Sequence, residues 1–173
     1  KEHWRKFALW DNVARTVLMI RVPDGAPGLP GGSSNGERCR RITSLVDLYP
    51  TLVDLAGLPA IDGLDGHSLA PLLADPRAEW SHPAITTYDV SEYSIRTERW
   101  RYIRYIDDSE ELYDHDRDPE EWTNLAGDPA FEAVIDELSS LIPANPAPLV
   151  ETSYPISAHH VPPWKSKEDY LRR

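Results

Sequence analysis

The clearest hydrophobic pattern in the chain lies near its middle. Over residues 100–106 (WRYIRYI), Trp, Tyr, Arg and Ile alternate with Arg, Ile and Tyr, a period of two that is typical of a half-buried strand. Shorter segments of similar character flank this run, and Asp107-Asp108-Ser109 supplies a polar turn. The pattern predicts a small antiparallel sheet, with strands at residues 84–88, 94–97, 100–106 and 111–114.

Two segments carry the spacing of helices. Asp128-Pro129 forms an N-cap followed by proline, after which apolar residues recur along one face. These residues are Phe131, Val134, Ile135, Leu138 and Leu141. An earlier helix is predicted to run from Asp47, its N-cap, to Gly57, its stop. Its predicted apolar stripe is Leu48, Leu52 and Leu55.

An apolar run and a glycine-rich segment precede that helix. Residues 16–22 (TVLMIRV) are nearly all apolar, which predicts a strand buried on both faces of a parallel sheet. Little else in the chain could pair with it in parallel, so we expect a larger sheet built by preceding sequence. Residues 24–36 hold five glycines and two prolines and are expected to form a loop. Residues 39–46 are read as a short strand.

Composition limits the classes of function. A net charge of -11 argues against a general nucleic-acid or anionic-membrane binder, because no positive field would steer either partner. No apolar run approaches the 18 residues of a membrane span. The single cysteine, Cys39, excludes an internal disulfide. The chain opens at Lys1 inside what reads as a structured element, so we interpret it as a fragment.

Spacing alone reveals no complete active site. None of the six histidines stands in a metal-ligand motif with a carboxylate, and no serine lies in a nucleophile elbow. Lys6 lies between Trp4, Phe7 and Trp10, shortly before the predicted strand at 16–22. It is the one candidate for binding an anion, and the alternative is a solvated lysine on an amphipathic turn.

Four stretches, in order, carry a resemblance to a known family. They are KEHWRKFALWDNVARTVLMIRVP, LVDLYPTLVDLAGLP, GLDGHSLAPLL, and YSIRTERWRYIRY with ELYDHDRDPEEWTNLA. Together they resemble the C-terminal part of the sulfatases of the alkaline-phosphatase-like superfamily, closest to the bacterial iduronate-2-sulfatase-like and choline-sulfatase-like branch.

The resemblance implies a fold and a site. The fold class is an α/β sulfatase fragment, with the final strand and helix of the main sheet followed by an α+β subdomain in which a small antiparallel sheet packs on a helix. The implied domains are residues 1–78, the end of the catalytic domain; 79–142, the sheet subdomain; and 143–173, a proline-rich arm. Lys6 corresponds to the lysine that contacts the sulfate group.

Other parts of the implied site are not in this chain. Sulfatases use a formylglycine made from the Cys or Ser of a C/S-x-P-x-R motif, and Cys39-Arg40-Arg41-Ile42-Thr43 does not match it. The implied Ca²⁺ or Mg²⁺ is also held by residues outside this chain. We therefore expect the isolated chain to be inactive and to need the remainder of the catalytic domain as its partner. The family favours a periplasmic or secreted location.

Substrate contacts are also predicted from the hairpin. Tyr93, Arg96 and Arg99 could reach an anionic group or sugar at the rim of the site. The favoured alternative is that these arginines pair with nearby acids such as Glu98, Asp107, Glu110 and Glu111.

Three functions are consistent with the sequence. The leading hypothesis is the C-terminal part of a sulfatase that hydrolyses a sulfate ester of a small molecule or carbohydrate. The second is a phosphonate or phosphodiester hydrolase of the same superfamily. The third is a non-catalytic structural or interaction module that docks through residues 16–22.

Overall fold

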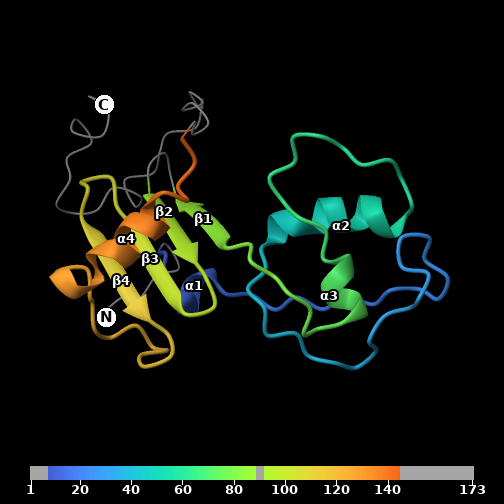
Figure 1. The fold of residues 1–173 in the computed structure, drawn as a ribbon, viewed down its shortest axis with the longest axis horizontal. Coiled ribbons are helices and arrows are strands. Elements are labelled where there is room, and N and C mark those ends of the chain that lie inside the picture. Colours follow the sequence, from blue (N-terminus) through green and yellow to red (C-terminus); the bar gives the residue numbers. More distant parts are fainter. Residues whose placement is uncertain (1–7, 89–91, 145–173) are drawn as a thin grey trace, which may run out of the picture.

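The computed structural model describes residues 8–88 and 92–144. Figure 1 shows a lobe built around the sheet, with α4 and α1 beside it, and a second lobe that holds α2 and α3. The elements are α1 (Asp11–Ala14), η1 (Leu45–Asp47), α2 (Leu48–Leu55), α3 (Ala70–Ala74), β1 (Ala84–Tyr88), β2 (Glu92–Arg96), β3 (Trp100–Arg104), β4 (Glu110–Asp114), η2 (Pro129–Phe131) and α4 (Glu132–Ser139).

The sheet is an antiparallel meander in the order β1-β2-β3-β4. All four predicted strands are confirmed, with bounds shifted by no more than two residues. The predicted turn connects β3 to β4, where Asp108 adopts a positive φ of 62° and the Asp107 carboxylate accepts from the backbone N–H of Ser109. Asp tolerates this left-handed conformation better than most residues, which explains the polar turn.

One face of the sheet forms the main core with α4. The register aligns Ile85, Ile95, Tyr102 and Leu112 across the four strands. Leu138 of α4 packs on them and is 1% exposed. The predicted cap is confirmed, since the Asp128 carboxylate accepts from the backbone N–H of Ala130 at 2.9 Å.

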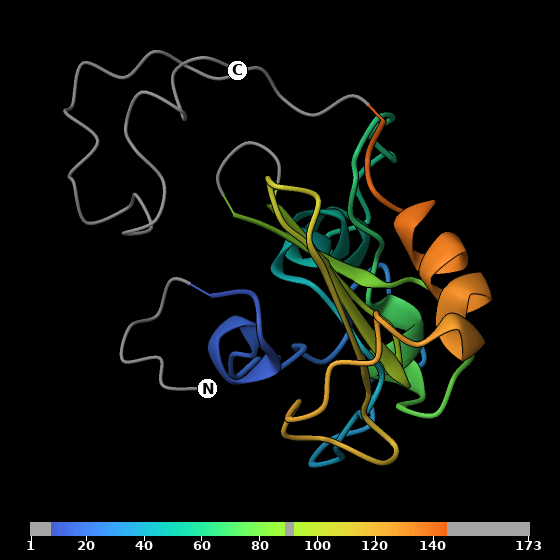
Figure 2. The same cartoon turned by 90° about the vertical axis from the view of Figure 1, so that its left-hand side faces the viewer.

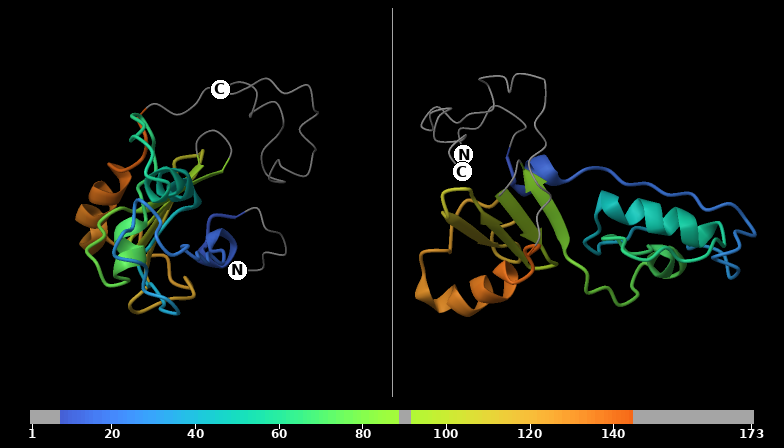
Figure 3. Two further views of the ribbon diagram at one scale, coloured as in Figure 1. Left: turned by 90° about the vertical axis from the view of Figure 1, so that its right-hand side faces the viewer. Right: turned by 90° about the horizontal axis from the view of Figure 1, so that it is seen from above.

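The opposite face of the sheet carries α1. Figures 2 and 3 show α1 and α4 on opposite sides of the strands. Leu9, just before α1, packs against Ile103 and Tyr113 and is 2% exposed. The Trp10 Nε1–H donates to the Glu111 carboxylate at 2.7 Å. The segment before α1 is therefore fixed to strands about a hundred residues later in the chain.

The second lobe is organised by Asp47. Its carboxylate accepts from the backbone N–H of Ser44 at 2.7 Å and from that of His67 at 2.9 Å. The segment that contains Gly66 packs closely against the backbone just before Asp47, since a Cβ added to Gly66 would lie 2.3 Å from the Val46 carbonyl oxygen. Asp47 directly precedes α2, but the predicted N-cap bond is absent, because the Asp47 backbone is helical and its side chain bonds to no backbone N–H of that helix. Gly57 ends α2 as predicted, with a φ of 65°.

The apolar stripe predicted for α2 was wrong in part. Leu52 is 64% exposed, whereas Thr51 and Val53 are buried. The cause is a polar contact that the periodicity did not include. The Thr51 hydroxyl donates to the Asp47 carbonyl oxygen and accepts from the backbone N–H of Leu69, which turns this face of α2 toward α3.

Two predicted strands do not form in the described residues. Residues 16–22 form no strand, and Val17 is 79% exposed and Met19 87% exposed. A buried strand needs partners on both sides, and the described part of the chain provides none there. Residues 39–44 form no strand, and Leu45 and Val46 begin η1. The Arg41 guanidinium donates to the carbonyl oxygens of Arg77 and Ala78, and the Trp80 Nε1–H donates to the Ile42 carbonyl oxygen.

Other predictions fall where nothing is described. Lys6 and residues 145–173, which make up nearly all of the predicted proline-rich arm, lie outside the described residues. Within the described ranges, no helix combines the length and apolar character needed to cross a bilayer.

We expect Asp47→Asn to lower the free energy of unfolding by about 1–3 kcal/mol. The amide can accept only one of the two backbone N–H bonds and turns an N–H toward the other donor. Urea unfolding of this chain measures the change. Asp62→Asn, at an exposed position, is the matched control and should be neutral. Equal stability of both variants would contradict the role given to Asp47.

Candidate functional site

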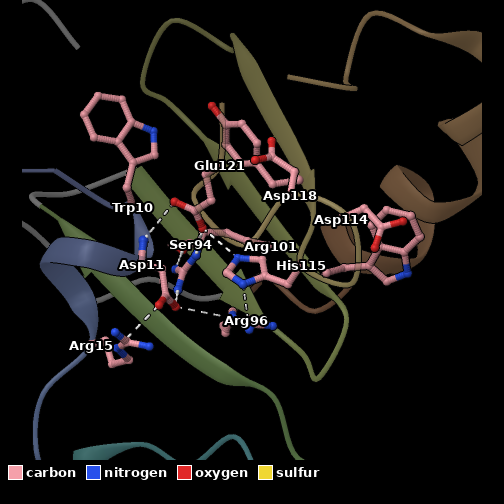
Figure 4. Close-up of polar contacts among 12 residues, drawn as sticks. Trp10, Asp11, Arg15, Ser94, Arg96, Arg101, Asp114, His115, Asp118 and Glu121 are labelled. Atoms are coloured by element: carbon pink, nitrogen blue, oxygen red, sulfur yellow. Dashed lines mark hydrogen bonds and ion pairs between the residues drawn. The ribbon is translucent and has the colours of Figure 1, made fainter. Parts of the chain in front are cut away.

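A cluster of charged residues lies on the face of the sheet that carries α1. Figure 4 shows these side chains pointing toward one another from α1, from β2 and β3, and from the chain after β4. The cluster, called here the Arg101 network, consists of Asp11, Ser94, Arg96, Arg101, His115 and Glu121.

Arg101 is the centre of this network and is only 2% exposed. Its Nη2 donates to Asp11 Oδ1 at 2.7 Å, and its Nη1 donates to Ser94 Oγ at 2.5 Å and to the Leu9 carbonyl oxygen at 3.1 Å. Its Nε lies 2.7 Å from Glu121 Oε1, but the direction is poor for a hydrogen bond, so this contact is mainly electrostatic.

Glu121 closes the network from the other side. One carboxylate oxygen accepts from the backbone N–H of Asp11 at 2.9 Å, and the other lies 2.9 Å from His115 Nε2. Glu121 is 2% exposed and has a φ of 58°, a left-handed conformation that is costly for a residue with a side chain. Such a conformation persists where the surrounding contacts fix it, as these do.

Arg96 completes the network and determines the tautomer of His115. Arg96 Nη2 lies 2.9 Å from His115 Nδ1, and its Nε lies 3.5 Å from Asp11 Oδ1. A guanidinium can only donate, so Nδ1 accepts and the proton of the neutral ring is on Nε2, facing Glu121. Within the network, the positive charges of Arg96 and Arg101 balance the negative charges of Asp11 and Glu121.

The charges shift the pKa values of these groups. Burial acts to raise the pKa of Asp11, but the hydrogen bond and charge of Arg101 outweigh it and hold that pKa below its usual value. Burial likewise opposes ionisation of Glu121, yet the His115 hydrogen bond and the Arg101 charge lower its pKa. Burial and the neighbouring Arg101 lower the pKa of Arg96.

These shifts predict a loss of stability in acid. Both carboxyl pKa values are lower in the folded state than their unfolded values of about 3.9 and 4.3, so the stabilisation is complete above that range and is lost as pH falls through the folded values. We expect the double variant Asp11→Asn/Glu121→Gln to lose less stability than the unsubstituted chain between pH 6 and pH 3. Thermal unfolding across this range measures the difference, and an identical pH dependence would contradict the prediction.

The network could be mistaken for a metal site. Ligand atoms of Asp11, His115 and Glu121 all lie within 4.8 Å of one another. However, His115 Nε2 carries the proton directed at Glu121, and both carboxylates already contact Arg101. These residues therefore do not fit a divalent cation, and the metal implied by the family is not placed here.

The substrate contacts predicted from the sequence lie in different surroundings. Lys6 is outside the described residues. Tyr93 is buried at 4% exposure, and Arg96 belongs to the Arg101 network. The Arg99 side chain is 46% exposed and forms an ion pair with Asp114 at 2.7 Å. Arg96 and Arg99 do form ion pairs, as the alternative interpretation expected. Their carboxylate partners are Asp11 and Asp114, however, and not the acids that the sequence suggested.

Arg99 also borders a cavity between the two lobes. The cavity has a volume of about 310 Å³ and is lined by Ile42, Trp80, Ser81, His82, Pro83, Thr97, Glu98 and Arg99. The His82 ring stacks on His67 at 3.6 Å between centroids. Burial and His67 lower the pKa of His82, which favours its neutral form.

Sequence reasoning missed the Arg101 network. Apart from Arg96, which was predicted as a substrate contact, its charged members read as ordinary exposed residues, since 90 and 110 residues separate Asp11 from Arg101 and Glu121. One signal was present: Arg101 shares a strand face with Ile103 and Tyr105. An arginine on an apolar face needs a buried carboxylate partner.

Solved structures place the fold in a class. A 2-O GAG sulfatase is 31% identical, with 65% of this chain and 27% of that chain aligned at a TM-score of 0.50. A phosphonate monoester hydrolase of Agrobacterium radiobacter is 32% identical, with 66% and 26% aligned at a TM-score of 0.52. The fold is thus a C-terminal α/β subdomain of the alkaline-phosphatase-like class.

The family follows from the sequence comparisons. Residues 2–145 match the family described as N-sulphoglucosamine sulphohydrolase, C-terminal, and the chain belongs to that family. A protein named "Sulfatase" from Formosa agariphila is 31% identical over 147 residues, which cover 85% of this chain and 27% of that protein. The chain therefore spans about a quarter of the length of this relative. The resemblance to sulfatases is confirmed, and the branch within them stays a prediction.

Proposed function

We propose that the chain is the C-terminal part of a sulfatase that hydrolyses a sulfate ester and that it contributes Lys6 to the active site. The observation that carries the proposal is the family match over residues 2–145, which includes Lys6 and the whole described sheet. The sulfatase relative aligned over 85% of the chain supports it.

Lys6 acts by charge. A compact ammonium beside the sulfuryl oxygens offsets the negative charge that develops as the S–O bond breaks. The formylglycine and a Ca²⁺ or Mg²⁺ ion, both held by residues outside this chain, supply the nucleophile and further charge neutralisation. The domain division at residues 78 and 142 belongs to the same proposal, with the exposed Val17 and Met19 packing on the remainder of the catalytic domain.

The substrate is a sulfated small molecule or carbohydrate. Support comes from the similarity to a 2-O GAG sulfatase. Among the three predicted contacts, Arg99 fits best, because its guanidinium is partly exposed and it borders the 310 Å³ cavity. Tyr93 and Arg96 have little exposed surface with which to contact a ligand.

A second candidate is a phosphonate or phosphodiester hydrolase. The observation that favours it is the similarity to the Agrobacterium phosphonate monoester hydrolase, whose TM-score of 0.52 is close to the 0.50 of the 2-O GAG sulfatase. The described subdomain is common to both activities, so the nucleophile outside this chain determines the choice.

Parallel assays of the full-length protein test the proposal. We expect kcat/KM for 4-nitrophenyl sulfate to exceed that for 4-nitrophenyl phenylphosphonate by about 100-fold or more. Replacing the nucleophile in the C/S-x-P-x-R motif of the full-length protein by alanine should abolish the sulfatase activity. A preference for the phosphonate would support the second candidate and contradict the first.

A further inference from the structure

The cavity between the two lobes has walls that are held in place by hydrogen bonds. The Arg41 guanidinium, which precedes α2, donates to the Glu98 carboxylate in the turn between β2 and β3 at 2.5 Å. The same guanidinium donates to two backbone carbonyl oxygens shortly before Trp80, and the Trp80 Nε1–H donates to the Ile42 carbonyl oxygen at 2.7 Å. These contacts shape the cavity before a ligand enters, which lowers the entropic cost of binding.

The ionised side chains of the lining already have partners of opposite charge. Glu98 pairs with Arg41 at 2.5 Å, and Arg99 pairs with Asp114 at 2.7 Å and with Asp116 at 3.7 Å. A free anion would have to compete with Asp114 for the Arg99 guanidinium. Charge is therefore not the main feature that this cavity offers to a ligand.

The unused hydrogen-bonding capacity lies on two uncharged side chains, Ser81 and His82. Within the described part of the chain, neither the Ser81 hydroxyl nor the His82 ring forms a hydrogen bond. The His82 ring is held by stacking on His67 at 3.6 Å and by an edge contact with Trp80 at 4.8 Å. Because burial and His67 lower its pKa, the ring is neutral at pH 7 and offers one donor and one acceptor.

The rest of the lining and the size of the cavity narrow the class of ligand. Ile42, Trp80 and Pro83 supply apolar surface beside the polar pair. The volume of about 310 Å³ is at the lower end of the range of small-molecule sites, about 300–1,000 Å³, and suits a single ring. A sugar ring matches this lining, since its hydroxyl groups both donate and accept and its C–H groups contact apolar and aromatic side chains.

We propose that this cavity, called here the Trp80 cavity, binds one uncharged sugar ring, whose hydroxyl groups hydrogen-bond to Ser81 and His82 and whose C–H groups contact Trp80. The place of the site rests on the cavity alone. The choice of a sugar among hydroxyl-bearing ligands rests on the proposed function, which includes a sulfated carbohydrate. Arg99, partly exposed beside the cavity, remains the contact proposed above for an anionic group.

Calorimetric titration of the full-length protein tests the site, with the nucleophile of its C/S-x-P-x-R motif replaced by alanine so that no ligand is turned over. The probes are the methyl β-glycosides of glucose, galactose and N-acetylglucosamine. We expect at least one of them to bind with millimolar affinity. Ser81→Ala and His82→Phe should each weaken this binding about three- to tenfold, the usual effect of losing one hydrogen bond.

The variants are chosen to leave the cavity walls in place. Phenylalanine at position 82 keeps a ring for stacking on His67 and removes both nitrogens. Ser81 is exposed, so Ser81→Ala carries the comparison if His82→Phe does not fold. Ser140→Ala, at an exposed serine that ends α4, is the matched control and should change the affinity less than about 1.5-fold.

Amide hydrogen exchange locates the bound sugar. With the same glycoside, exchange over residues 80–82 and 97–99 should slow about twofold or more, and exchange over α4 should not change. Protection confined to other segments would place the sugar elsewhere and would overturn the proposal.

The remaining outcomes separate this proposal from the sulfatase assignment. Binding of none of the three glycosides, or equal affinity in Ser81→Ala and His82→Phe, would overturn the sugar site. Displacement of the glycoside by sodium sulfate, with binding lost in Arg99→Gln, would identify an anion site and would overturn it as well. An unsubstituted protein that is inactive on sulfate esters would overturn the proposed function alone, because the titrations do not depend on turnover.

Discussion

Lys6→Ala in the full-length protein is expected to lower kcat/KM for an aryl sulfate by about 10²–10³-fold, the usual cost of removing one preorganised donor from a charged transition state. The substitution removes the one lysine that the family resemblance places at the sulfate. Steady-state kinetics with a fluorogenic aryl sulfate measure the loss.

The neighbouring basic residue provides the control. Arg5→Ala removes a positive charge one position away and should change kcat/KM less than about threefold. Equal losses for the two variants would show that general positive charge in this segment is sufficient, and an unchanged kcat/KM for Lys6→Ala would eliminate its assignment.

Arg101→Met is expected to lower the free energy of unfolding by about 3–5 kcal/mol, the usual cost of breaking a buried ion pair from one side. The methionine fills similar volume but leaves Asp11 and Glu121 without their central cation, and Glu121 is 2% exposed. Urea unfolding of this chain, monitored by tryptophan fluorescence, provides the comparison.

Neutralising the partners should restore part of that stability. In the triple variant Arg101→Met/Asp11→Asn/Glu121→Gln no buried carboxylate lacks a partner, so its free energy of unfolding should lie above that of the single variant. A loss below about 1 kcal/mol for Arg101→Met would place the network among ion pairs of little energetic weight.

The sheet and α4 were predictable because their signals are local. Alternation over residues 100–106 gives β3, and the Asp128-Pro129 cap with its apolar spacing gives η2 and α4. Gly57 at a φ of 65° likewise ends α2 where the sequence predicted. In each case neighbouring residues carry both the propensity and the boundary.

The wrong predictions for residues 16–22 and for α2 share one physical cause, because both elements depend on contacts with residues that are distant in the sequence. The run at residues 16–22 has the composition of a buried strand, but composition does not supply the neighbouring strands, and Met19 is 87% exposed. The stripe of α2 was displaced by the hydroxyl of Thr51, which bonds to Leu69. Contacts of this kind depend on which distant segments pack against each other, and the local periodicity of the sequence does not encode that packing.

The candidate site was even less predictable from the local sequence than the fold. The local sequence marked Lys6 only as a candidate for binding an anion, and its role at the sulfate group came from the family resemblance. The Arg101 network joins residues separated by up to 110 positions, and its charges read locally as solvated. Only the position of Arg101 on an apolar strand face signalled that carboxylate partners were required.

The long separation between α1 and its contacts on the sheet has a consequence for the order of folding. The meander of β1 to β4 pairs neighbours in sequence, so its loops are short and close early. Docking of residues 9–11 closes a loop of about 90 residues and carries a larger entropic cost. We therefore expect the hairpins and α4 to assemble first, and the N-terminal segment to join them last.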